Sequence, residues 1–350
     1  MGFRETALAR NSATLNSREL HVVQQETTDV LEQADVMPLW SQDYTQLGKG
    51  AFSGSIASMS YSGMQVFRET MNRAVDAIAN APANAYVVGL STVIDGESSW
   101  GLLPVKSNSL ITLDKNAELF FRTSKFSEIA AVVISDQRLE EYAAQVEWVD
   151  LRKIMEDVRP VDLISPSISS RLLTLLVDGP RQILEYSDTD SLDIMWNHYE
   201  NDLLTTCLQA LISSKENPKS HHDYRIHRYI VNRVRELTLS NVDAPLTISE
   251  LCAHLKVSRR TLNHAFVRVL GITPVAYMRN IRLNRVRREL KSKPHQITSI
   301  ASVAIKWGFW HMSLFSRYYR ELFGECPMDT LIRCRAEKYN CSSLKKPLRS

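Results

Sequence analysis

The sequence predicts an α+β fold, in which a strand-rich N-terminal domain with added helices precedes an all-helical C-terminal domain. Short runs of β-favouring residues, separated by turn clusters, fill the chain from about residue 20 to residue 135. From Asp136 onward, apolar residues recur at steps of three and four, which is the period of an α-helix. The length of 350 residues accommodates two domains of ordinary size.

The N-terminal strands are predicted from runs rich in β-branched and aromatic residues. They cover residues 52–61, 85–94, 109–113, 118–122 and 129–134. Turn signals such as Asp95-Gly96-Glu97 separate them. One stretch, residues 65–81, predicts a helix instead. A strand core of this kind fits a small β-barrel that holds a ligand. Residues 1–17, which precede it, are polar and predict a loose arm.

A long apolar stripe marks the helical part that follows. Its members are Leu192, Met195, Trp196, Tyr199, Leu203, Cys207, Leu208 and Leu211. Two interpretations stay open, because such a stripe either faces the core of its own domain or forms a dimer. Residues 215–224, with Pro218 and the adjacent His221 and His222, predict a polar linker with solvated histidines.

Charge is unevenly distributed along the chain. The net charge is only +3, from 42 Lys and Arg against 39 Asp and Glu. Residues 245–350 hold 20 of these basic residues and 6 of the acidic ones, so the C-terminal part is strongly basic and the remainder acidic. This polarisation indicates a polyanionic partner. Because the basic residues are interleaved with core-type apolar residues, a folded nucleic-acid module is favoured over a membrane-surface tail.

The sequence lacks the residue patterns that several kinds of functional site require. The five cysteines are unclustered and are expected to be free thiols: Cys207, Cys252, Cys326, Cys334 and Cys341. No histidine lies between His21 and His198, which argues against a histidine-ligated metal centre, and no cofactor is expected to be required. Gly48-Lys49-Gly50 is too short for a phosphate loop, and the G-x-S-x-G motif is absent. Without a secretory signal or an apolar run of about 18–20 residues, we expect a cytoplasmic protein with no membrane partner.

A helix over residues 225–239 leads into the first of two similar helical patterns. Thr247 and Glu250 predict a capping box at the start of a short helix, 248–255. After a turn, Ser258 caps a longer helix, 259–270, which ends at Gly271. The spacing predicts that this longer helix buries one face and exposes the other.

The exposed face of helix 259–270 carries the first group of predicted DNA-binding residues. These are Ser258, Arg259, Arg260, Asn263 and His264. The last three recur at i, i+3 and i+4, opposite Leu262 and Phe266. Arginine pairs well with guanine and asparagine with adenine, while the positively polarised helix start suits phosphate. The alternative is an ordinary solvated face.

The pattern then recurs about 50 residues later. A basic helix, 275–291, connects to a short helix, 297–305, a turn at Trp307-Gly308-Phe309, and a helix, 311–323, that ends at Gly324. The predicted DNA-binding residues of this second pattern are His311, Met312, Ser313 and Arg317. Two such units address successive major-groove faces about 34 Å apart. The sequence therefore predicts two helix-turn-helix motifs, at about 247–270 and 297–323.

These residues carry a family resemblance. The stretch from about Ile226 to Arg333 resembles the AraC/XylS family of transcription regulators in its motifs Ser258-Arg259-Arg260-Thr261-Leu262, Leu270-Gly271-Ile272-Thr273-Pro274, Arg282-Leu283, Ala301-Ser302-Val303-Ala304, Trp307-Gly308-Phe309, Phe315-Ser316-Arg317 and Phe323-Gly324 through Pro327. The resemblance implies promoter binding and gene activation through RNA polymerase. It also implies base-reading roles for six of the residues: Arg260, Asn263, His264, Met312, Ser313 and Arg317. Met312 and Leu314 are apolar where many members carry hydrogen-bonding residues, so the second reader is expected to sense thymine methyl groups or backbone shape.

The N-terminal half also resembles the sensor of the ethanolamine-operon regulator subgroup. The motifs are Thr27-Thr28-Asp29-Val30, Phe52-Ser53-Gly54 and Gln65-Val66-Phe67-Arg68-Glu69. The resemblance implies an amine or amino alcohol as effector, with cobalamin as a co-effector. A cationic effector would use residues of the kind found at Trp40, Tyr44, Tyr61, Trp100, Asp95 and Glu97, each of which is more typical of a core or a turn. Arg68 is either a surface charge on a helix or a group that pairs with an acid.

The sequence therefore predicts a ligand-responsive transcription regulator. Residues 18–214 form its regulatory, effector-binding and dimerisation domain, 215–224 the linker, 225–333 the DNA-binding domain and 334–350 a basic tail. The expected partners are double-stranded promoter DNA, RNA polymerase, a small-molecule effector and a second copy of the chain. The competing class is a DNA-tethered enzyme with an N-terminal barrel, which the missing motifs disfavour. An architectural DNA protein is disfavoured by the roughly 200 residues ahead of the reader, more than DNA bending alone needs.

Overall fold

The computed structural model describes residues 15–101, 103–186, 192–214, 222–241 and 245–343. The fold is mixed α+β, and the chain divides into two compact units. The first comprises Met1–Tyr44 and Ser53–Ser220, and the second comprises Thr45–Phe52 and His221–Ser350. The 45–52 segment thus belongs to the helical unit, although its sequence lies within the predicted regulatory domain. Most of the predicted arm and linker lies outside the described residues.

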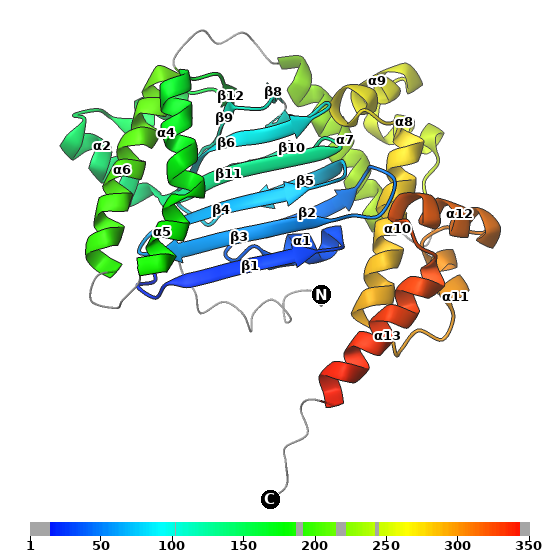
Figure 1. Ribbon diagram of the computed structural model, residues 1–350. Helices are drawn as coiled ribbons and strands as arrows, with labels where there is room; N and C mark the ends of the chain where they lie inside the picture. The colour runs from blue at the N-terminus through cyan, green and yellow to red at the C-terminus, as the bar shows by residue number, and fades with distance from the viewer. Residues whose placement is uncertain (1–14, 102, 187–191, 215–221, 242–244, 344–350) are drawn as a thin grey trace, which may run out of the picture. The chain divides into compact units, whose positions relative to one another are not determined.

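Two sheets form the centre of the strand-rich part (Figure 1). The larger has the order β1-β3-β4-β11-β6-β9-β12, and the smaller has the order β2-β5-β10-β7-β8. Their strands are β1 (His21–Thr27), β2 (Ser41–Gln46), β3 (Gly54–Tyr61), β4 (Met64–Met71), β5 (Val75–Asn80), β6 (Ala85–Asp95), β7 (Ser99–Trp100), β8 (Leu103–Pro104), β9 (Ser109–Leu113), β10 (Glu118–Arg122), β11 (Phe126–Ser135) and β12 (Val161–Asp162). The five strands predicted from sequence are confirmed as β3, β6, β9, β10 and β11.

The helix predicted over residues 65–81 is wrong, because the structure forms the antiparallel strands β4 and β5 there. Strand β4 is buried on both faces, with Val66 on the helix-covered face and Phe67 on the opposite one. A strand buried on both faces shows no simple polar–apolar alternation, so its sequence lacks the usual strand signature. As a result, Arg68 projects from a strand and not from a helix.

Helices cover one face of the larger sheet, as α4, α5 and α6 do in Figure 1. The helices of this unit are α1 (Val30–Val36), α2 (Asp136–Val146), α3 (Leu151–Asp157), α4 (Pro166–Val177), α5 (Gly179–Tyr186) and α6 (Leu192–Ser213). The stripe on α6 is buried in the core of its own unit, where Trp196, Leu203 and Leu208 pack with residues of the sheet and of α4. Core packing accounts for the stripe, so it gives no separate support for a dimer.

The second unit is helical apart from the 45–52 segment. Its helices are α7 (His222–Ser240), α8 (Ile248–Leu255), α9 (Arg259–Leu270), α10 (Pro274–Ser292), α11 (Ile300–Lys306), α12 (Met312–Phe323) and α13 (Pro327–Ser343). Helix α10 lies between the pair α8–α9 and the pair α11–α12 (Figure 1). At about 1.5 Å per residue, its 19 residues span about 28 Å.

Candidate nucleic-acid interface

The first helix pair is held by the caps that the sequence predicts. Thr247 accepts from the backbone of Glu250, whose carboxylate accepts from Thr247 in return, so the capping box is complete. Helix α8 ends at Lys256 in the left-handed conformation, with φ of 54°. Ser258 then caps α9, and Gly271 ends it with φ of 67°. Both ends of α9 are therefore fixed by local hydrogen bonds and backbone conformation.

Helix α9 buries one face and exposes the other. Leu262, Ala265 and Phe266 are fully buried. All five predicted DNA-binding residues of this pair are exposed: Ser258, Arg259, Arg260, Asn263 and His264. The His264 ring also lies against His227 of α7, with 5.0 Å between the ring centroids. The predicted DNA-binding residues thus share the exposed face of α9, and the His264 ring contacts α7.

The second helix pair is anchored by Glu289 of α10. One carboxylate oxygen of Glu289 accepts from Lys306 Nζ at 2.6 Å and from Trp307 Nε1 at 2.9 Å. Trp307 and Gly308, with φ of 80°, form the turn between α11 and α12. These bonds fix the turn against α10, and therefore also the start of α12. Helix α11 begins at Ile300, three residues later than predicted.

On α12, Phe315 and Tyr319 are buried, as predicted. His311, Ser313 and Arg317 are exposed. Met312 is half-buried and packs against the core of this pair, so only part of its side chain is available to a partner. Leu314 and Trp310 are exposed apolar side chains at the same end of the helix. The outer surface of α12 is therefore less polar than that of α9.

Two basic side chains near α12, those of Arg279 and Lys49, were not predicted from the sequence to lie there. The guanidinium of Arg279, on α10, lies 4.3 Å from the ring centroid of Tyr318. Lys49, in the 45–52 segment, pairs with Glu321 at 2.8 Å and leaves Arg317 only a 3.9 Å contact to that carboxylate. The hydrogen bond from Lys49 lowers the pKa of Glu321. Lys49 and Arg317 thus share Glu321, the one acidic residue of α12, and Lys49 makes the shorter contact.

The 45–52 segment is bonded to α10 and α12. Asn284 and Gln46 exchange two hydrogen bonds, and Asn280 donates to the carbonyl of Leu47 at 3.3 Å. The Gln46 amide donates to the carbonyl of Leu322 at 2.6 Å. Asn280, Asn284 and Gln46 are all buried, so these bonds satisfy polar groups that water does not reach. No pattern in the sequence predicts that the 45–52 segment contacts α10 and α12.

The residues considered for a cationic effector lie apart in the first unit. Tyr44 and Trp100 are buried, and Trp100 donates to the carbonyl of Thr112. Tyr61 bonds to Asp193, while Asp95 and Glu97 are exposed and pair with basic side chains. They form no common pocket among the described residues.

A buried carboxyl that the sequence did not single out lies between the two sheets. Glu69 accepts from Gln33 Nε2 at 2.9 Å and from the Tyr44 hydroxyl at 3.2 Å. Burial raises the pKa of Glu69 from 4.5 to about 7, although both hydrogen bonds oppose the rise. Among the described residues no cation pairs with it, so the carboxyl is partly protonated near neutral pH.

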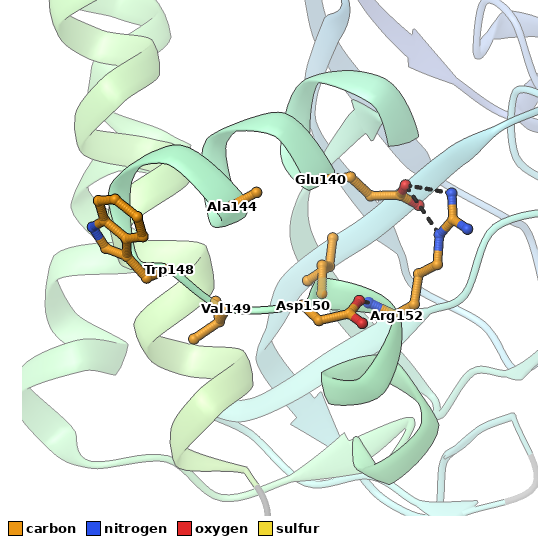
Figure 2. Close-up of a pocket in the computed structure, with 7 residues that line it drawn as sticks. Glu140, Ala144, Trp148, Val149, Asp150 and Arg152 are labelled. Carbon is orange, nitrogen blue, oxygen red and sulfur yellow. Dashed lines mark hydrogen bonds and ion pairs between the residues drawn. The ribbon is translucent and has the colours of Figure 1, made fainter.

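A cavity of about 480 Å³ lies beside α2 and α3, and the charged side chains that line it are paired (Figure 2). Burial disfavours ionisation of Glu140, but hydrogen bonds from Arg152, Lys115 and Tyr86 outweigh it and hold the pKa at about 2. Asp150 accepts from the backbone at the start of α3. Trp148, which is 88% exposed, lies at the other end of the cavity from Glu140. A cation bound in this cavity would therefore not contact both the Trp148 ring and an unpaired carboxylate.

The described part of the chain lacks two kinds of feature. It contains no group of three or more His, Cys, Asp or Glu side chains placed to hold a metal ion. None of its helices combines the length and apolar character that crossing a membrane requires.

A comparison with known protein families finds a match within the helical unit. The family model described as a helix-turn-helix domain matches residues 251–333. The XylDLEGF operon transcriptional activator 2 of Pseudomonas putida is 32% identical over 141 residues, covering 40% of this chain and 87% of that protein. Another XylDLEGF operon transcriptional activator of Pseudomonas putida is 29% identical over 160 residues, covering 44% of this chain and 46% of the relative.

The matched part of the chain thus spans about half the length of that second activator. Among solved structures, a regulator from Rhodopseudomonas palustris CGA009 assigned to the AraC family is 33% identical. The alignment covers 30% of this chain and 97% of that chain, with a TM-score of 0.29.

Proposed function

The chain belongs to the AraC/XylS family of DNA-binding transcription regulators, and from this premise we propose that it activates a catabolic operon by reading promoter DNA with two helix-turn-helix units. Helices α9 and α12 are the readers. Arg260, Asn263 and His264 contact bases in one major-groove segment, and Ser313 and Arg317 contact the next. Ser258, Arg259 and His311 lie at the helix starts, where they contact phosphate.

The observation that carries this proposal is the pair of exposed faces on either side of one helix. Arg260 and Arg317 are both exposed, on α9 and α12, while the opposite faces of these helices are buried. Helix α10 separates the two pairs and spans about 28 Å. Successive major-groove faces on one side of a duplex are about 34 Å apart, so two readers separated by such a helix match adjacent turns.

Control by a small molecule and contact with RNA polymerase complete the proposed function. The strand-rich unit ahead of the readers supports the first, because DNA binding alone does not need it. An enzymatic role remains the weaker candidate, since the described residues contain neither a metal cluster nor a nucleophile motif. The names of the Pseudomonas putida relatives, which are operon activators, support an activating role here.

The test is a footprint of the full chain on the DNA upstream of its own gene and of the adjacent operon. We expect two protected major-groove segments about 10 base pairs apart on one face of the duplex. Inserting about five base pairs between them would rotate one segment to the opposite face and weaken binding to the level of a single segment. A single protected segment, with no effect of the insertion, would contradict the two-reader proposal.

A further inference from the structure

Three basic side chains of the second unit gather near the C-terminal end of α12. Lys49 Nζ lies 2.8 Å from one carboxylate oxygen of Glu321, and Arg317 Nε lies 3.9 Å from the other. The Arg279 guanidinium, on α10, lies 4.3 Å from the ring centroid of Tyr318, and that of Arg317 lies 5.2 Å from the same centroid. Lys49, Arg279 and Arg317 are named the basic cluster below.

The three cations of the basic cluster act on one carboxylate. The pKa of Glu321 is lowered first by the hydrogen bond from Lys49 and then by the charges of Lys49, Arg317 and Arg279. The side chains of Lys49 and Arg317 are 70% and 60% exposed, so an anion from outside the chain can reach both. Because one carboxylate does not neutralise three cations, the cluster keeps a positive charge.

The backbone on both sides of Lys49 is fixed. Gln46 Nε2 donates to the carbonyl of Gly48 at 2.9 Å and to the carbonyl of Gly50 at 2.8 Å. The N–H of Gly50 donates to two carbonyls at the end of α12, at 3.0 and 3.2 Å. The φ of Gly50 is 102°, a conformation that glycine adopts without strain. Backbone and amide bonds thus hold Lys49 beside α12, while its side chain stays exposed.

The ion pair between Lys49 and Glu321 is not what fastens the 45–52 segment. The buried hydrogen bonds between Gln46 and Asn284 already do so. Both partners of the ion pair are exposed, and an exposed ion pair contributes little to stability because water solvates both charges. Fastening of the segment therefore does not explain why a lysine stands at this position.

The basic cluster adjoins the exposed face of α12. Arg317 belongs to both, since it is exposed on that helix together with His311 and Ser313. When a helix enters a major groove, which is about 12 Å wide, the two sugar-phosphate backbones form the walls of the groove. Basic side chains that flank the helix then meet phosphate oxygens. Such oxygens would supply the negative charge that Glu321 alone does not.

We propose that Lys49 and Arg279 bind the phosphate backbone of the duplex whose major groove α12 reads. This assignment rests on the proposed function, because it adds backbone contacts to that DNA interface. Lys49 lies about 200 positions before residues 251–333, which match the helix-turn-helix model. The part of the chain predicted from sequence to be regulatory therefore supplies a DNA contact of its own.

The experiment measures the affinity of the full chain by fluorescence anisotropy, on a duplex with the footprinted site and on a random-sequence duplex of equal length. Lys49→Gln and Arg279→Gln should each weaken binding about three- to tenfold at about 50 mM salt, to the same extent on both duplexes. Each should also reduce the slope of log affinity against log salt by about 1, because one phosphate contact fewer releases fewer counterions.

Two further variants serve as controls. Lys49→Arg keeps the positive charge and should retain the wild-type affinity and slope. Lys125→Gln changes a lysine of the first unit that is 72% exposed and pairs with Asp95 at 2.9 Å, so it matches Lys49 in exposure and pairing. It should leave both quantities unchanged.

Glu321→Gln separates a phosphate contact from a purely structural ion pair. If Lys49 met only Glu321, removing either partner would break the same pair and change DNA binding in the same direction. If the basic cluster meets phosphate, Lys49→Gln weakens binding, whereas Glu321→Gln removes a repulsive charge and tightens it by about two- to fivefold. Weaker binding by both variants, or an unchanged affinity and slope for Lys49→Gln, would overturn the proposal.

The two duplexes keep this proposal apart from the proposed function. If Lys49→Gln loses affinity and slope on both duplexes but the chain shows no two-segment footprint, only the two-reader proposal is contradicted. If the two-segment footprint is present and Lys49→Gln binds as the wild type does, only the phosphate contact is contradicted.

Discussion

Gln46 and Asn284 are 238 positions apart in the chain and form a reciprocal pair of hydrogen bonds. The backbone N–H of Gln46 donates to Asn284 Oδ1 at 3.2 Å, and Asn284 Nδ2 donates to the carbonyl of Gln46 at 3.3 Å. Asn284 lies on α10, between the helix pairs α8–α9 and α11–α12. The 45–52 segment, which begins at the end of β2, is thus bonded to the helix between the two pairs.

Asn284→Ala should destabilise the helical unit. The substitution leaves the buried N–H and C=O of Gln46 without partners, and an unsatisfied buried group costs about 1–3 kcal/mol. Chemical denaturation of the full chain measures this change. Asn263→Ala is the matched control, because Asn263 is exposed on α9 and its loss should change stability by less than about 0.5 kcal/mol. Equal stability of the two variants would mean that the pair contributes nothing.

Gly324→Ala should be more harmful than Gly271→Ala. Gly324 ends α12 and Gly271 ends α9 in the left-handed conformation, with φ of 77° and 67°. That conformation costs an L-residue about 1–2 kcal/mol at either position. A Cβ at position 324 would also lie 2.9 Å from the backbone nitrogen of Ala51, so the 45–52 segment would have to move. Melting temperatures of the two variants test the difference, and a larger loss for Gly271→Ala would refute it.

Arg260→Ala and Arg259→Ala should affect DNA binding in different ways. Arg260 is expected to contact a base, so its loss should cost about 1–3 kcal/mol on the cognate site and relax one base preference. Arg259, at the start of the same helix, is expected to contact phosphate, so its loss should weaken all sequences equally and reduce the salt dependence. Fluorescence anisotropy on the cognate site and on single-base variants measures both. The assignment fails if Arg260→Ala weakens every sequence to the same extent.

Glu69 should make the stability of the first unit depend on pH. The folded protein holds the Glu69 proton more tightly than the unfolded chain, because the pKa rises from 4.5 to about 7 on folding. The free energy of unfolding should therefore fall as the pH rises from about 4.5 to 7, by up to about 3 kcal/mol, and level off above.

Glu69→Gln should remove this dependence and stabilise the protein at pH 8 more than at pH 5, as thermal unfolding at both values would measure. Glu118→Gln, an exposed carboxylate on β10, serves as the control. If Glu69→Gln shifts the melting temperature equally at both pH values, the raised pKa is ruled out as the cause.

The sequence by itself determined the local features of this protein. The caps at Thr247, Ser258 and Gly271, and the inward faces at Leu262 and Phe315, follow from rules that act over a few residues. The exposure of Arg260 and Arg317 could be predicted for the same reason, since burying one face of a helix exposes the other.

Only the tertiary structure decided the rest. It placed residues 65–81 in two strands, because burial on both faces of β4 removes the alternation that identifies a strand. It brought Gln46 to Asn284, Lys49 to Glu321 and Arg68 to Glu128. Pairs so far apart in sequence leave no periodic signal, since their contact depends on how whole elements pack and not on the residues beside them.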